Sequence, residues 1–110
     1  MSINRTITGT ELFHDALMKM SERVFQRLVV EAAERRGWMV YHTYDSGRSR
    51  AGYPDLTMVR GGVVIFAELK KMGEKPKPEQ KQWLDALPNS FFWVPTDMDA
   101  IKTLLSDTTL

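Results

Sequence analysis

The sequence contains no cysteine, which excludes disulfide bonds and thiolate metal sites. It also contains no apolar run approaching the roughly 20 residues that a membrane-spanning helix needs. Residues 1–6 lack the hydrophobic core of a secretion signal. From these absences we expect a cytoplasmic protein that does not contact a membrane.

A large charge of one sign is also missing, because the formal net charge is only +1, which argues against a dedicated DNA coat protein. The charge is unevenly distributed, however: the stretch 70–81 contains five lysines and two glutamates. At 110 residues the chain is long enough for one domain with a single core and too short for two. Basic patches around an acidic centre suit an enzyme that grips phosphates and holds a cation.

The spacing of apolar residues predicts the order helix, helix, strand, two-stranded hairpin, helix, strand, helix. We expect helices over 10–19, 22–36, 78–87 and from about 97 to 105, and strands over 39–44, 55–60, 63–70 and 91–94. The last strand returns through a helix, so it can lie parallel to a neighbour. The three tryptophans, Trp38, Trp83 and Trp93, lie in apolar contexts and are predicted to be core residues. The fold class is therefore α/β or α+β, a mixed sheet flanked by helices.

The hairpin predicts which side chains face each other. Gly61-Gly62 separates two strand-like runs, and both positions of such a two-residue turn need a positive φ, which glycine adopts freely. With this turn Arg60 faces Val63, and five steps further down the ladder Asp55 faces Glu68. Like charges directly opposite each other destabilise a sheet.

Lys70 follows Glu68 by two residues, so it projects from the same face of the strand as Glu68. Two carboxylates, from Asp55 and Glu68, are the kind of oxygen ligands that Mg²⁺ or Mn²⁺ accepts together with water and phosphate oxygens. A lysine beside them can orient water or offset negative charge on a phosphate. The pattern matches metal-assisted phosphodiester hydrolysis, and an ordinary solvated strand pair is the alternative that the residues alone leave open.

Basic residues surround this pair along the sequence. Arg48 and Arg50 lie in the polar loop before Asp55, where they are either solvated charges or phosphate contacts; we favour phosphate contacts because Asp55 is so near. Tyr53 can stack or pack at the rim of the cleft that would hold this carboxylate pair. The further lysines that would extend a DNA-binding surface are Lys71, Lys75, Lys77 and Lys81.

Gly52-Tyr53-Pro54-Asp55, followed by Glu68-Leu69-Lys70, resembles the PD-(D/E)xK nuclease motif. A wider pattern is more specific: 21–26, Gly37-Trp38, 48–55 and 78–84 together resemble the virus-type replication-repair nuclease (VRR-NUC) family. The likeness covers about residues 21–106. It implies one domain over 1–110, with a restriction-endonuclease-like core at 21–106 and a helical extension at 1–20. That extension could cover the sheet or take part in a dimer contact.

The resemblance assigns roles to individual residues. It makes Glu22 an acidic member of the active site that touches the metal through a water. It makes Asp55 and Glu68 metal ligands with the Leu69 carbonyl, Lys70 the catalytic lysine, and Gln80 a further catalytic residue facing the same cleft. Gln26 lies one helical turn from Glu22, can point the same way, and is a candidate supporting residue. Without the resemblance Glu22 would pass as an ordinary first-turn glutamate.

The resemblance also implies an activity. Stand-alone members of the family occur in bacteriophages and bacteria, which suggests a homodimeric, Mg²⁺- or Mn²⁺-dependent endonuclease that resolves four-way (Holliday) junctions by recognising DNA shape. This would place the protein in the cytoplasm of a bacterial or phage-infected cell, without an organic cofactor. The alternatives are a flap or single-strand nuclease in repair or replication, and a catalytically silent nucleic-acid-binding domain.

Overall fold

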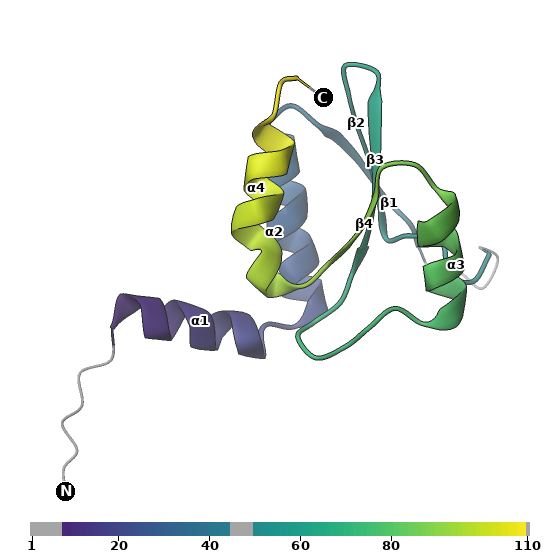
Figure 1. Cartoon of the computed structure of the whole chain (residues 1–110). Coiled ribbons are helices and arrows are strands. Elements are labelled where there is room, and N and C mark those ends of the chain that lie inside the picture. The colour runs from purple at the N-terminus through teal and green to yellow at the C-terminus, as the bar shows by residue number, and fades with distance from the viewer. Residues whose placement is uncertain (1–7, 45–49, 110) are drawn as a thin grey trace, which may run out of the picture.

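A four-stranded mixed sheet forms the centre of the protein (Figure 1). The computed structural model describes residues 8–44 and 50–109. The strands lie in the order β1-β2-β3-β4, with β2 antiparallel to both of its neighbours, β1 and β3, and β4 parallel to β3. Their bounds are Met39–His42 for β1, Leu56–Arg60 for β2, Val63–Leu69 for β3 and Ser90–Trp93 for β4. The predicted mixed sheet and its parallel last strand are confirmed.

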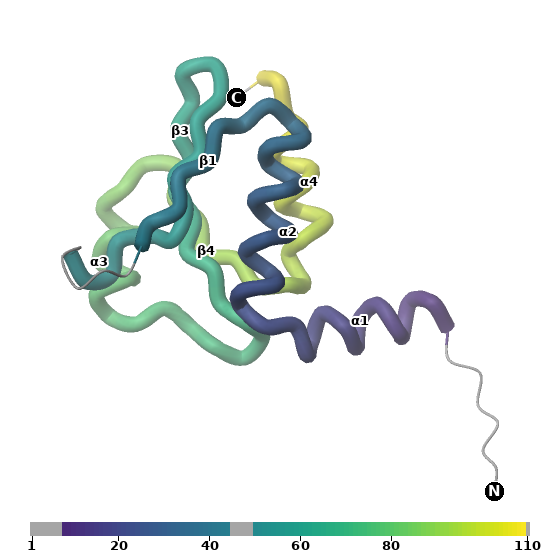
Figure 2. Tube along the Cα trace, turned by 180° about the vertical axis from the view of Figure 1, so that it is seen from behind, coloured from purple at the N-terminus to yellow at the C-terminus, as the bar shows by residue number. Residues whose placement is uncertain are grey.

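Helices cover both faces of this sheet. On one side α2 (Glu22–Glu34) and α4 (Met98–Ser106) pack against each other, and on the other side α3 (Pro78–Ala86) lies against β3 and β4 (Figures 1 and 2). A short 3₁₀ turn, η1 (Pro95–Asp97), links β4 to α4. The predicted element order and fold class are therefore confirmed, with η1 as an addition.

The core lies between the sheet and the pair α2 and α4. Apolar residues at helical spacing on α2 meet the inward-facing residues of β2 and β3, which alternate with outward-facing ones as strand geometry requires. The largest fully buried apolar side chains are Phe25, Val29, Leu56, Met58, Ile65, Leu69, Ile101 and Leu105. Trp38 and Trp93 belong to this core, as predicted.

Trp83 does not belong to the core, so that prediction was wrong. It lies on α3, which contains no buried residue, and its side chain is only partly covered. The apolar neighbours of Trp83 in the sequence indicated burial, but α3 is a short helix on the thinner side of the sheet. Its indole instead contacts the loop that leads into β2, as described below.

Three helices begin at residues whose type favours a helix start. The Thr8 hydroxyl accepts a hydrogen bond from the Glu11 N–H (3.0 Å) at the start of α1 (Gly9–Lys19), and the Ser21 hydroxyl accepts one from the Val24 N–H (3.1 Å) at the start of α2. Pro78 occupies the first turn of α3. Local sequence signals thus set where these helices begin.

Helix α1 extends away from the rest of the protein (Figure 1). Its C-terminal part lies near η1, where Leu17 is buried, and it does not cover the sheet. Leu12, Phe13 and Met18 remain exposed along it. In the part of the chain that is described, no helix is both long and apolar enough to cross a membrane.

Arg60 fixes the turn end of the hairpin against the helices. Its guanidinium lies 4.5 Å from the centre of the Trp38 ring and donates hydrogen bonds to three backbone carbonyls at the ends of α2 and α4. These carbonyls belong to Arg36, Leu105 and Asp107. The register of the hairpin is therefore anchored at one end, and its other end leads to the candidate site.

Candidate active site

The hairpin places the two predicted carboxylates on one face. Gly61 and Gly62 have φ of 55° and 82°, as the predicted turn requires, and Arg60 pairs with Val63. The pairing continues to Leu56 and Ala67, so the next step along both strands sets Asp55 opposite Glu68. The predicted register is confirmed over the paired residues.

Asp55 is held by the backbone on both sides. Its Oδ2 accepts a hydrogen bond from the Leu69 N–H at 2.8 Å, and its main-chain oxygen accepts one from the Thr43 N–H at 2.8 Å. The strand β1 ends at His42, two residues earlier than predicted. The hydrogen bond from the Thr43 N–H to the Asp55 carbonyl continues the pairing of β1 with β2 by one residue. The Asp55 carboxylate is thereby fixed beside the residue that separates Glu68 from Lys70.

Glu68 is buried, with only 1% of its surface exposed. Its Oε2 lies 3.6 Å from the Lys70 Nζ, and among the described residues its Oε1 is buried without a hydrogen-bond partner. A buried polar atom without a partner costs free energy and calls for an explanation. The unpaired Oε1, next to the Asp55 carboxylate, is the kind of oxygen that a hard divalent cation binds, so these residues fit the predicted metal.

The environment of Glu68 raises its pKa to about 8. The main cause is burial, which disfavours the charged form, and the second is the nearby negative charge of Asp55; the Lys70 ammonium acts in the opposite direction. Without a cation this carboxyl group therefore keeps its proton at neutral pH. A bound divalent cation would favour the charged form instead.

We predict that the metal-free protein loses stability as the pH rises from about 4.5 to about 8. The unfolded chain releases the Glu68 proton near pH 4.5 and the folded protein near pH 8, so the folded state binds more protons between these values. The free energy of unfolding should fall by about 2–4 kcal/mol across that window from this group. Urea denaturation at pH 5 and pH 8, in the presence of a chelator, measures the difference.

The matched control is Glu68→Gln, which keeps the shape of the side chain and has no proton to release. This variant should lose most of the decrease between pH 5 and pH 8. Adding Mn²⁺ at pH 8 should raise the melting temperature of the natural protein and not that of the variant. An equal pH dependence in both proteins would contradict the cause given for the raised pKa.

Glu22 lies at the start of α2, near enough to Asp55 and Lys70 for their charges to affect its pKa. Its pKa is raised, first by burial and then by the charge of Asp55, and Lys70 acts against the shift. Within the ranges that the structure describes, no three His, Cys, Asp or Glu side chains cluster closely enough to hold a metal ion. Glu22, Asp55 and Glu68 therefore do not form a close group of three carboxylates in this structure.

Gln26, one turn after Glu22 on α2, forms a hydrogen bond through Nε2 with the Nε2 of His42 (3.1 Å). His42 lies on β1, so this bond joins α2 to the edge strand of the sheet. Its immediate role in the structure is therefore to connect two elements behind the site.

Asp55 and Gln80 line one cavity of about 470 Å³ on the α3 side of the sheet. The residues around it are Thr43, Tyr44, Arg50, Ala51, Gly52, Tyr53, Asp55, Lys77, Glu79 and Gln80. The Gln80 Oε1 accepts a hydrogen bond from the Lys77 N–H (2.8 Å), which caps the start of α3. The structure thus brings Gln80 to the same cleft as Asp55, with its carbonyl oxygen engaged in the helix cap.

Gly52 sets the distance between the loop and α3. Its φ is +92°, and a Cβ atom there would lie 2.6 Å from the backbone carbonyl carbon and oxygen of Glu79 and 2.9 Å from the Gln80 nitrogen. Only glycine permits this contact without a shift of the backbone. The close approach of the two backbones forms the wall of the cavity between Asp55 and Gln80.

The predicted DNA-binding residues are found in different settings. Arg48 lies outside the described residues, whereas Arg50 and Lys77 line the cavity. Lys71, Lys75 and Lys81 are exposed, and the Lys81 Nζ lies 3.1 Å from the Asp85 Oδ2, which offsets its charge.

Tyr53 packs at the cleft rim rather than standing free. Its ring makes edge contacts with Phe66 (centroids 6.3 Å apart) and with Trp83 (5.0 Å). Of the two outcomes that the sequence allowed at the rim, stacking or packing, the structure shows packing, and Tyr53 also lines the cavity.

Sequence reasoning missed several residues that line the cavity. Thr43, Tyr44 and Glu79 were not singled out, and Gly52 was used only as part of a motif. Thr43 donates a hydrogen bond through its hydroxyl to the Pro54 carbonyl (2.8 Å), which ties β1 to the residue before Asp55. The signal available for Glu79 was its place beside Gln80 in the first turn of α3.

A solved structure described as a VRR_NUC domain is similar to this chain. The two share 27% sequence identity and a TM-score of 0.60, and the match covers 79% of this chain and 96% of the other. No protein-family model matches the sequence, and no curated protein matches it. The resemblance and the fold inferred from the sequence are thus confirmed by an independent comparison of structures.

Proposed function

Because this chain belongs to the VRR-NUC family, we propose that it is a nuclease that hydrolyses DNA phosphodiester bonds with a divalent metal ion. The observation that carries the proposal is the buried Glu68, whose unpaired Oε1 lies on the same sheet face as Asp55 and Lys70. A purely structural hairpin would more often place opposite charges across its strands. We treat residues 1–110 as one nuclease domain with its family core at 21–106.

Asp55, Glu68 and the Leu69 carbonyl would hold the cation, Mg²⁺ or Mn²⁺, and Glu22 would reach it through a water. When bound, such an ion polarises the scissile phosphate and lowers the pKa of a nearby water. The Lys70 ammonium, kept 3.6 Å from the Glu68 carboxylate, is positioned to offset the charge that develops on the phosphate. The Leu69 N–H orients the Asp55 carboxylate throughout.

We propose branched DNA as the substrate, with a four-way junction as the preferred form. One domain of this size carries one site, so two symmetric incisions need a second copy related by a two-fold axis. The cavity beside Asp55 presents Arg50 and Lys77, which suit phosphate contacts and not the reading of base sequence. A homodimer that recognises DNA shape accounts for these features together.

The second candidate is a flap or single-strand nuclease. A site that makes one incision in a single strand needs no partner subunit, and the cavity next to Asp55 carries Arg50 and Lys77 for contacts to one strand. A silent DNA-binding domain is less consistent with the buried Glu68, because binding alone gives no reason to keep an unpaired carboxylate oxygen inside the protein.

Cleavage of labelled four-way junction, flap and linear duplex, with Mg²⁺ or Mn²⁺ and then with a chelator, tests the proposal. Paired, symmetric nicks in the junction support the junction activity, and cuts confined to the flap support the second candidate. Binding of DNA without cleavage of any substrate under either metal would overturn the proposal of a nuclease.

We predict that Arg48→Ala together with Arg50→Ala weakens DNA binding and reduces its dependence on salt. If both arginines contact phosphates, the slope of log K against log salt should flatten by about 2, since each phosphate contact contributes about 0.9. Titration of junction DNA at several salt concentrations measures the slope.

The control removes the same charge elsewhere. Arg35→Ala with Lys102→Ala deletes two exposed cations on the α2 and α4 side of the protein, away from the cavity. It should leave the slope near that of the natural protein. An unchanged slope in the Arg48 and Arg50 double variant would show that these arginines do not contact phosphate.

A further inference from the structure

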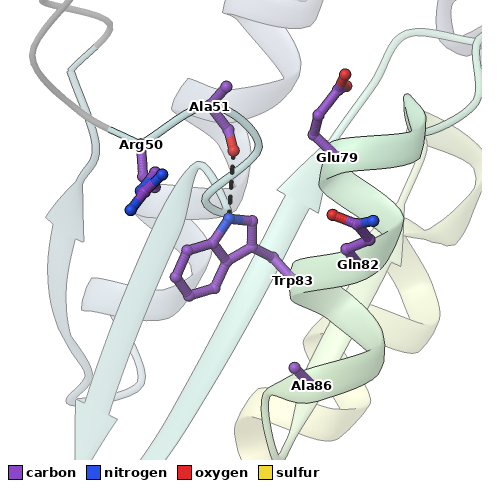
Figure 3. A pocket seen from close by; sticks show the side chains of 6 residues that line it. All are labelled: Arg50, Ala51, Glu79, Gln82, Trp83 and Ala86. Atoms are coloured by element: carbon purple, nitrogen blue, oxygen red, sulfur yellow. Dashed lines mark hydrogen bonds between the residues drawn. The ribbon is translucent and has the colours of Figure 1, made fainter.

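A second hollow adjoins the cavity of Asp55. It has a volume of about 600 Å³, and its residues are Arg50, Ala51, Glu79, Gln82, Trp83 and Ala86 (Figure 3). Arg50, Ala51 and Glu79 also line the Asp55 cavity, so the two spaces share a wall. Its volume lies within the range of about 300–1,000 Å³ that is usual for small-molecule sites.

Trp83 is the main apolar surface of this hollow and is held in a fixed orientation. Its indole N–H donates to the Ala51 carbonyl at 3.2 Å, the bond drawn in Figure 3, and its ring makes an edge contact with Tyr53 at 5.0 Å and 74°. Because the N–H is engaged, the ring offers a ligand its aromatic surface rather than a hydrogen bond.

Polar groups surround this aromatic surface. Figure 3 shows Glu79 and Gln82 on α3, near Trp83, and Arg50 on the loop across from them. Carboxylate and carboxamide groups can pair with the donors and acceptors at the edge of a heteroaromatic ring, and a guanidinium can bind a phosphate or stack. A flat aromatic floor with such a rim matches the chemistry of a nucleobase attached to a sugar-phosphate chain.

We propose that this hollow binds an unpaired nucleobase of the DNA strand that is cut, next to the scissile phosphate. The proposal rests on the proposed nuclease function and specifies its substrate. The shared wall at Arg50 and Glu79 means that a strand whose phosphate lies by Asp55 has an adjacent base within reach of Trp83. A base inside a duplex is stacked and paired and cannot reach this surface. On a four-way junction the hollow would therefore take a base at the branch point whose pair has opened, and on a flap it would take an unpaired base directly.

The alternative is that Trp83 only pins the loop to α3. Both ideas use the same hydrogen bond and the same contact with Tyr53, so the test must fill the hollow without touching Trp83. Ala86 is exposed at the end of α3 and lines the hollow, and a leucine there would fill part of the space beside Trp83. Ala100, exposed on α4 and outside the hollow, offers the same substitution as a control.

The experiment measures binding of metal-free protein to two single strands of equal length, one of thymidines and one of abasic sugar-phosphate units. We expect the natural protein to bind the base-bearing strand about tenfold more tightly, as one stacked base contributes in other single-strand-binding proteins. Ala86→Leu should bind both strands equally, and Ala100→Leu should keep the preference. Trp83→Phe, which retains an aromatic ring, should keep most of the preference, and Trp83→Leu should lose it.

Equal binding of both strands by the natural protein would overturn the proposal, and so would an unchanged preference in Ala86→Leu. Since no metal and no cleavage are involved, this result is independent of the nuclease assay. If the protein prefers bases at this hollow but cuts no DNA, the proposed base site is supported and the proposed nuclease function is refuted. If the protein cuts junctions but binds the thymidine and abasic strands equally, the nuclease function is supported and the base site is refuted.

Discussion

Glu68→Gln is expected to lower DNA cleavage by about 1,000-fold or more while metal-free DNA binding stays within about twofold. The substitution keeps the volume of a side chain that is 1% exposed, so the fold should persist. It removes the ionisable carboxyl group, to which a divalent cation would bind in place of the proton. The amide oxygen that remains is a poorer ligand than a carboxylate oxygen. Single-turnover cleavage of a junction and a binding titration in chelator measure the two effects separately.

Asp55→Asn should give a loss of the same order, because its amide oxygen can still accept the Leu69 N–H and only the charge is removed. The control is Glu34→Gln, at the exposed end of α2, which should cleave like the natural protein. If either site variant retained cleavage at the natural rate, the assignment of the carboxylate pair to the metal would be refuted.

Gly52→Ala is expected to have the largest effect of any glycine-to-alanine substitution in the described part of the chain. A Cβ there would lie 2.6 Å from the Glu79 backbone, and the φ of +92° is one that alanine rarely adopts. We expect a loss of about 2–4 kcal/mol in the free energy of unfolding, from strain and from separation of the loop and α3. Cleavage should fall with it, because Asp55 and Gln80 lie on the two sides of this contact.

Gly73→Ala separates the two causes. Gly73 has a similar φ of +86°, but no heavy atom beyond its two chain neighbours lies within 4 Å of a Cβ added there. Its replacement by alanine should lower the free energy of unfolding through backbone strain alone, by about 1 kcal/mol, and should leave cleavage unchanged. Urea denaturation of both variants gives the comparison, and equal losses would contradict the proposed clash with Glu79.

The hairpin and its opposed carboxylates could be predicted from the sequence because their causes are local. A Gly-Gly turn fixes the pairing, and the two-residue period of a strand then carries that information from Arg60 to Asp55. The helix starts at Ser21 and Pro78 were also readable, since capping depends on residues within one turn. The order of elements, with a helix between the last two strands, indicated the parallel pairing of β4.

The rest of the site depends on how distant segments pack. No local pattern says that Gly52 meets Glu79, or that Trp83 leaves the core to reach the Ala51 carbonyl 32 residues earlier in the chain. Gln80 was linked to the cleft through the family resemblance, and the structure adds that its carbonyl oxygen caps α3. The positions of these residues follow from tertiary contacts that propensity and spacing do not encode.

The two-glycine corner limits how this protein can change over evolutionary time. An insertion or deletion of one residue in β3 would send Glu68 and Lys70 toward the buried α2 and α4 side and turn Ala67 or Leu69 toward Asp55. Length changes in pairs would restore the orientation, although they would shift the distance to the corner. Related chains should therefore differ in the length of this strand by even numbers of residues or not at all. In a library of β3 insertions, only variants with an even number of added residues should retain cleavage.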